Sequence, residues 1–116
     1  MTTSHDSPAT ITPEDLDGLA GAVLLDVRDL EEWRAGYLDG SLLLPLGLLD
    51  PAALPAGATV VVVCDTGERS AAAATLIAGT GRTAFVLEGG LRAWADTGLV
   101  LRTSDGEVGV LAPGPR

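Results

Sequence analysis

The sequence predicts a single α/β domain in which helices cover a mainly parallel β-sheet. Apolar residues make up 47% of the 116 residues and are mostly Leu, Val and Ala, while aromatic residues make up only 3%. This composition suits parallel strands covered by Ala- and Leu-rich helices better than an aromatic-rich sandwich. Short apolar runs also alternate with helix-forming segments, an order typical of parallel strands joined by crossover helices. The length fits one domain of roughly 100–150 residues.

The first part of the chain predicts a short strand, a helix and a buried strand. Residues 1–9 are small and polar, and we expect them to be flexible. An edge strand and a helix are expected at residues 11–16, because Thr12 can cap the helix and Pro13 suits its first position. The apolar run at residues 22–27 has the length of a buried strand.

The remaining elements are predicted by caps, breakers and β-branched runs. They are a helix between Asp29 and Gly36, a strand at 42–44, a helical turn at 46–53, a central strand at 59–63, a helix at 70–78, a strand at 84–87 and a helix after Gly89 and Gly90. From Thr103 onward the chain is rich in Gly and Pro. We therefore place the folded domain at residues 10–102 and expect a tail at 103–116, lying on the surface or disordered.

Charge and cysteine content restrict the classes of partner. The chain has 7 basic and 16 acidic residues, a formal charge of −9, with no basic cluster. A nucleic acid or an anionic membrane surface is therefore not an expected partner. The apolar runs are shorter than the roughly 20 residues of a membrane span, and the N-terminus lacks a signal-peptide pattern. One cysteine cannot form an internal disulfide, and these absences together favour the cytoplasm.

The single cysteine begins the stretch CDTGERS, residues 64–70, directly after four valines. In an open parallel sheet, ligands bind beyond the carboxyl ends of the strands. A loop between a strand and a helix can aim several backbone N–H groups at one point, and Gly67 supplies the backbone freedom for such a turn. These dipoles stabilise an anionic sulfur, which is the nucleophilic form of cysteine. The alternative is that Cys64 is a small buried hydrophobic residue.

Four ordered segments extend this pattern over residues 10–101. They are LDVR with EW at residues 25–33, GYLDGS at 36–41, CDTGERS at 64–70, and LEGG with AW at 87–94 followed by Gly98. In this order and at these separations they resemble the single-domain rhodaneses, a family of sulfurtransferases. The resemblance implies a three-layer rhodanese-like fold, with a five-stranded, mainly parallel sheet flanked by helices on both faces.

The resemblance also implies a mechanism. Cys64 takes a sulfane sulfur as a persulfide and hands it to a thiol or another nucleophilic acceptor. The expected substrate-binding residues are Asp65, Thr66, Gly67, Glu68 and Arg69. Because the chain has one cysteine, the acceptor must bring the second nucleophile. The expected donor is a small sulfane-sulfur compound or a protein persulfide, and no cofactor or metal ion is expected.

Two other functions have to be weighed. Phosphatases and arsenate reductases of related fold place five residues between the cysteine and the arginine of their loop, whereas four separate Cys64 from Arg69. The shorter loop closes a smaller pocket, which fits a sulfur atom better than a tetrahedral oxyanion. A non-catalytic binding module is the second alternative. The retention of Cys64 in a complete loop argues against it.

The acidic residues of the loop predict a preference among sulfur donors. Many thiosulfate-using relatives carry a basic residue just after the cysteine, where this chain has Asp65, and Glu68 lies beside Arg69. An acidic rim would slow the approach of the thiosulfate dianion. We therefore expect poor thiosulfate turnover and a persulfide donor. For Arg69 the sequence leaves two roles open, which are orienting substrate and pairing with a carboxylate to brace the loop.

Several further residues of the resembling segments are interpreted as structural. Asp26, Arg28 and Glu32 are expected to form a buried ion-pair network rather than a catalytic relay. Trp33 and Trp94 are expected to anchor helices to the core. Tyr37 stands where the family commonly has a histidine, a position that we interpret as part of the scaffold.

Overall fold

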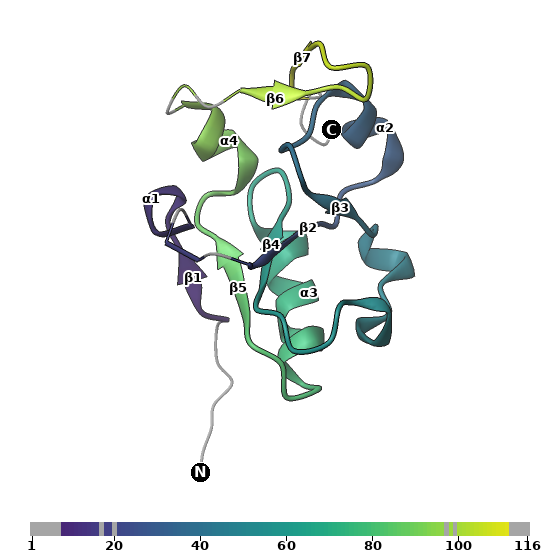
Figure 1. Cartoon of the computed structure of the whole chain (residues 1–116), viewed down its shortest axis with the longest axis vertical. Helices are drawn as coiled ribbons and strands as arrows, with labels where there is room; N and C mark the ends of the chain where they lie inside the picture. Colours follow the sequence, from purple (N-terminus) through teal and green to yellow (C-terminus); the bar gives the residue numbers. More distant parts are fainter. Residues whose placement is uncertain (1–7, 17, 20, 97, 99, 112–116) are drawn as a thin grey trace.

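A five-stranded parallel sheet forms the centre of the computed structural model, which describes residues 8–16, 18–19, 21–96, 98 and 100–111 (Figure 1). The strands are β1 (Thr10–Ile11), β2 (Val23–Asp26), β3 (Leu42–Leu43), β4 (Val60–Val63) and β5 (Ala84–Leu87). Their order is β1-β5-β4-β2-β3, and every neighbouring pair is parallel. The predicted central strand, β4, is in the middle and is buried throughout.

Helices cover both faces of this sheet. They are α1 (Pro13–Leu16), α2 (Leu30–Ala35), α3 (Glu68–Ala78) and α4 (Gly90–Asp96), with two 3-10 turns, η1 (Leu46–Leu48) and η2 (Pro51–Ala53). Because side chains alternate along a strand, Val60 and Val62 pack in one cluster with residues of α3, whereas Val61 and Val63 pack in another with residues of α1 and α4. The predicted three-layer fold is confirmed.

The predicted helix starts have the expected caps. The backbone N–H of Asp15 donates to Oγ1 of Thr12 at the start of α1. At α2, Asp29 accepts from the N–H of Glu32, while Glu32 accepts from the N–H of Asp29. This reciprocal capping box fixes the position of Glu32 on α2, and that position matters at the site described below.

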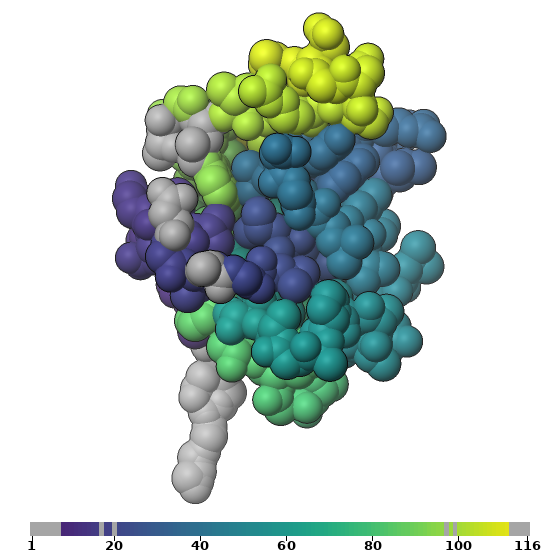
Figure 2. Space-filling model, in the orientation of Figure 1, coloured from purple at the N-terminus to yellow at the C-terminus, as the bar shows by residue number. Residues whose placement is uncertain are grey.

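The stretch after Thr103 differs from its prediction. Residues 101–109 form an antiparallel hairpin of β6 (Leu101–Arg102) and β7 (Val108–Gly109), which lies at the top of the molecule next to α2 (Figure 2). The backbones of Tyr37 and Arg102 exchange two hydrogen bonds, and the N–H of Val110 donates to the carbonyl of Ala35. Of the two states expected for this stretch, residues 103–111 thus have the ordered one on the surface, and the expected domain boundary after residue 102 falls inside the hairpin. Residues 1–7 and 112–116, the outer parts of the expected flexible N-terminus and tail, lie outside the described residues.

The two tryptophans make different contacts. The ring of Trp33 stacks on Tyr37 with centroids 3.9 Å apart and an interplanar angle of 3°. Trp94 packs against the cluster that contains Leu91 and Leu101. Trp94 thus packs helix α4 against the core, as expected, whereas the contact shown for Trp33 is the stacking on Tyr37. Within the described ranges, no helix has the length and apolar character that crossing a membrane requires.

Candidate active site

The Cys64 sulfur lies at the carboxyl end of β4, within hydrogen-bond distance of two backbone N–H groups and a hydroxyl. Its Sγ atom is 3.0 Å from the backbone N of Gly67, 3.3 Å from the backbone N of Ser70 and 3.2 Å from Oγ of Ser70. Cys64 is only 1% exposed. Two amide dipoles and a hydroxyl therefore converge on one buried sulfur atom, and this arrangement stabilises negative charge on it.

The start of α3 supplies these donors. The first N–H groups of a helix have no partner within the helix. Gly67 caps α3 with a φ of 124°, a backbone conformation that favours glycine. This turn brings the N–H groups of Gly67 and Ser70 to the sulfur, while the Ser70 hydroxyl also reaches the carbonyl oxygen of Gly67 at 3.1 Å. The positive end of the α3 dipole consequently faces Cys64.

The start of α4 supports the loop from the other side. The N–H groups of Leu91 and Arg92 donate to the carbonyl oxygens of Cys64 and Asp65, at 2.9 and 3.1 Å. This approach requires glycine at position 90, where φ is +68° and a Cβ atom would lie 2.4 Å from the Asp65 oxygen. The LEGG segment therefore has a direct role in holding the Cys64 loop.

The side chain of Asp65 does not lie on an open rim. Asp65 is 4% exposed, and its Oδ1 pairs with Nε of Arg92 at 2.9 Å. The prediction that Asp65 repels an approaching dianion from the rim is therefore wrong in its geometry. The physical reason is the packing of α4 against the loop, which encloses the carboxylate and brings an arginine to it.

Glu68 and Thr66 are the exposed residues of the loop. The Thr66 hydroxyl donates to the Glu68 carboxylate. This bond and the backbone amide of Glu68 lower the pKa of that carboxyl. Of the two acids predicted for the rim, only Glu68 occupies it.

Arg69 pairs with a carboxylate from outside the loop. Its Nη1 and Nη2 donate to Oε1 and Oε2 of Glu32, at 2.6 and 2.9 Å. These bonds are the main reason that the pKa of Glu32 falls from 4.5 to about 2, with the backbone N–H of Asp29 contributing, and they raise the pKa of Arg69. Of the two roles left open for Arg69, the structure shows the pairing that braces the loop.

The expected network of Asp26, Arg28 and Glu32 is divided in two. Asp26 and Arg28 form a buried ion pair, with Nη2 to Oδ2 at 2.8 Å and side chains no more than 1% exposed. Arg28 also donates to the carbonyl of Gly36 at 2.8 Å. The Glu32 carboxylate instead accepts hydrogen bonds from the guanidinium of Arg69, 37 residues further along the chain. Asp26 and Arg28 are thus structural, and Glu32 is the member that reaches the site.

We expect Glu32→Gln to lower the free energy of unfolding at about pH 7 by ~1–2 kcal/mol. The shift in pKa from 4.5 to about 2 sets an upper limit that solvent screening reduces, since the Arg69 side chain is 32% exposed. A depressed folded-state pKa stabilises the protein above the unfolded value and ceases to do so as the pH falls towards 2. Urea unfolding of both proteins should show the difference shrinking between about pH 5 and pH 2. An equal difference in unfolding free energy at pH 7 and at pH 2 would contradict this role of the Glu32 charge.

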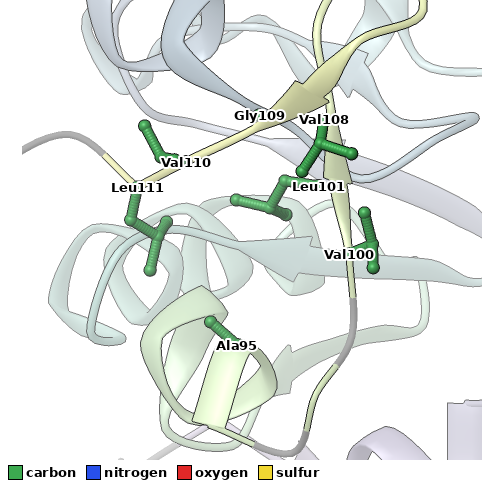
Figure 3. A pocket seen from close by; sticks show the side chains of 7 residues that line it. All are labelled: Ala95, Val100, Leu101, Val108, Gly109, Val110 and Leu111. Carbon is green, nitrogen blue, oxygen red and sulfur yellow. The ribbon is translucent and has the colours of Figure 1, made fainter.

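An apolar hollow of about 320 Å³ lies away from this loop, between the hairpin and the end of α4 (Figure 3). Its walls include Ala95, Val100, Leu101, Val108 and Leu111. These side chains carry no titratable or nucleophilic group. In the part of the chain that the structure describes, no cluster of three or more His, Cys, Asp or Glu side chains could hold a metal ion.

Comparison with known proteins agrees with this architecture. The family model of the rhodanese-like domain matches residues 12–97. A probable adenylyltransferase/sulfurtransferase, MoeZ of Mycobacterium tuberculosis, is 40% identical over 96 residues, which cover 75% of this chain and 24% of that protein. The chain thus spans about a quarter of the length of this curated relative.

Solved structures share the fold. A rhodanese-related protein from Thermoplasma volcanium superposes with a TM-score of 0.75 at 28% identity, covering 80% of this chain and 96% of that one. The human single-domain sulfurtransferase TSTD1 gives a TM-score of 0.66 at 28% identity, covering 76% and 96%. Together with the four motif segments and the family match, these similarities show that the chain belongs to the rhodanese-like domain family.

Proposed function

We propose that the protein is a sulfurtransferase that carries a sulfane sulfur as a persulfide on Cys64. The observation that supports it best is the position of Sγ, buried at the end of β4 with two backbone N–H groups and a hydroxyl around it. Such a site would stabilise the negative charge of a bound terminal sulfur. The names of two relatives, MoeZ and TSTD1, include sulfurtransferase, in agreement with the proposal.

The reaction has two balanced steps. The Cys64 thiolate attacks the terminal sulfur of a donor, an S–S bond forms, and the donor's own S–S bond breaks with its electron pair leaving on sulfite or on a thiolate. An acceptor thiolate then attacks the terminal sulfur of the persulfide, and Cys64 leaves as thiolate. Since the chain has one cysteine, the second thiol comes from the acceptor. A reducing compartment such as the cytoplasm keeps both thiols available.

The burial of Cys64 favours donors with a terminal sulfur. Its side chain is at the base of the loop, and the residue is 1% exposed. A single terminal sulfur atom, as in thiosulfate or a persulfide, is the smallest electrophile that the thiolate could attack there. Phosphate-ester hydrolysis has less support, because the arginine that would bind the phosphate is occupied by Glu32.

Mass spectrometry of the intact chain after incubation with a sulfane-sulfur donor tests the proposal. The expected result is a gain of one sulfur atom, located on the peptide that contains Cys64 and removed by a thiol reductant. Cys64→Ser should gain none. If neither thiosulfate nor a persulfide donor adds sulfur to the wild-type protein, the proposal is wrong and a binding role becomes the better explanation.

We expect Ser70→Ala to lower kcat for sulfur transfer by about three- to tenfold. The substitution removes the hydroxyl, which is 3.2 Å from Sγ, and leaves the Ser70 and Gly67 N–H groups in place. The hydroxyl donates to the Gly67 carbonyl and can turn to donate to a negatively charged sulfur. Loss of one such donor to a charged acceptor destabilises it by roughly 1 kcal/mol or more. Steady-state kinetics measure the effect, and Thr75→Ala, a hydroxyl deletion further along α3, is the control. Equal kcat for Ser70→Ala and the control would exclude the hydroxyl from the mechanism.

A further inference from the structure

Two arginines contact the Cys64 loop, and a carboxylate holds each of them. Arg69 lies in the first turn of α3, at the end of the CDTGERS segment, and forms two hydrogen bonds with Glu32 of α2. Arg92 lies in α4 and pairs with Asp65. Arginines beside a nucleophile ordinarily attract anionic substrates, often through the same two-bond geometry that Glu32 occupies. Here both positive charges are matched by acids of the same chain.

Arg69 is adjacent in the chain to a residue that contacts Sγ. It directly precedes Ser70, whose N–H is 3.3 Å from Sγ. The negative charge of Cys64 is among the causes that raise the pKa of Arg69, in agreement with this proximity. An Arg69 side chain without a carboxylate partner would therefore place a cation next to the incoming donor. Glu32 prevents this because both of its carboxylate oxygens accept hydrogen bonds from Arg69.

Glu32 is itself held firmly in this role. Its backbone N–H donates to Asp29 at 3.0 Å, and its Oε1 accepts from the Asp29 N–H at 3.1 Å while also accepting from Arg69. The Glu32 side chain is 17% exposed. The capping box of α2 thus anchors the carboxylate that restrains the loop arginine.

We propose that Glu32 determines the charge class of the sulfur donor by holding and neutralising Arg69. This inference depends on the proposed sulfur transfer at Cys64. With Arg69 paired and Glu68 exposed on the rim, the loop attracts a dianion such as thiosulfate weakly. A thiol persulfide, which carries less charge at its reacting end, is the favoured donor. Glu32 acts through Arg69 and is a positioning residue.

The test compares kcat/KM for thiosulfate with kcat/KM for cysteine persulfide in the wild-type protein and in Glu32→Gln. Glutamine still accepts a hydrogen bond at this position of a capping box, so the substitution removes mainly the charge. We expect the thiosulfate-to-persulfide ratio to rise about three- to tenfold at low salt and less at high salt. The matched control is Glu31→Gln, which removes one charge from an exposed neighbour on the same helix. Its ratio should not change.

Two further variants make the result decisive. In the double variant Glu32→Gln with Arg69→Gln the ratio should return to the wild-type value, since both charges are gone. If Glu32→Gln does not fold, Arg69→Gln alone serves, and its ratio should fall because the Glu32 charge is uncovered. An unchanged ratio in folded Glu32→Gln, or a rise in Arg69→Gln, would overturn the role of Glu32 while Cys64 still takes up sulfur. Failure of the wild-type protein to take up sulfur from either donor would overturn the proposed function as well.

Discussion

Cys64→Ser is expected to lower kcat/KM for sulfur transfer by at least about a thousandfold, the scale on which removal of a nucleophile acts. A serine hydroxyl ionises far less readily than a thiol and cannot form the S–S bond on which the reaction depends. The side chain keeps its size, and the donors around Sγ can bind the oxygen instead. The folded state should therefore remain.

Steady-state assays with thiosulfate and with a persulfide donor measure this loss, and circular dichroism with urea unfolding checks the fold. A residual activity within tenfold of the wild type, in a folded protein, would remove Cys64 from the mechanism. A comparable loss caused by unfolding alone would show as a shifted unfolding midpoint.

Gly90→Ala is expected to lower the free energy of unfolding by about 2–5 kcal/mol. A residue with a side chain is strained by roughly 1–2 kcal/mol at a positive φ, and overpacking adds about 1–3 kcal/mol. At this position φ is +68°, and the new Cβ would meet the Asp65 carbonyl oxygen at 2.4 Å and that of Cys64 at 2.8 Å. All of these contacts are with backbone atoms, which cannot rotate away. Sulfur transfer should fall too, because α4 then displaces the loop.

Gly40→Ala separates the strain of a positive φ from the steric contact with the loop. Gly40 has a similar φ of +83°, but a Cβ there meets nothing within 4 Å. This variant should lose only about 1–2 kcal/mol and should keep its activity. Urea unfolding of both variants, with kinetics on each, measures the difference. Equal losses at the two positions would show that α4 does not press on the loop as the structure indicates.

The fold was predictable because its elements are local patterns. Four consecutive valines, the Asp29 cap and the breaker at Gly36 each determine structure within a few residues, and the alternation of strands and helices predicts the parallel sheet. The hairpin of β6 and β7 was not predictable in this way. Its strands are two residues long and show no periodicity, and its stability depends on contacts with Tyr37 and Ala35, more than 60 residues earlier in the chain.

The site was predictable in its centre and not in its charge pairing. The sequence places Cys64 after a buried strand and before a helix, and this order predicts the N–H groups around it. It does not determine which acid faces which arginine, because several acids precede Arg69 and only packing selects Glu32. Asp65 was expected on the rim because it directly follows Cys64 in the loop. The glycine pair at the start of α4 was the available signal, since Gly90 permits a close approach to the loop.

The measurement that tests the central claim most directly is a single-turnover transfer from the loaded protein. The chain is incubated with a persulfide donor, separated from it by gel filtration, and then mixed with an acceptor thiol. We expect one sulfur atom per chain to move to the acceptor, and Cys64 to return as a free thiol that mass spectrometry can detect. A purified chain that holds no sulfur, or one whose sulfur stays in place when the acceptor is added, would contradict transfer through Cys64.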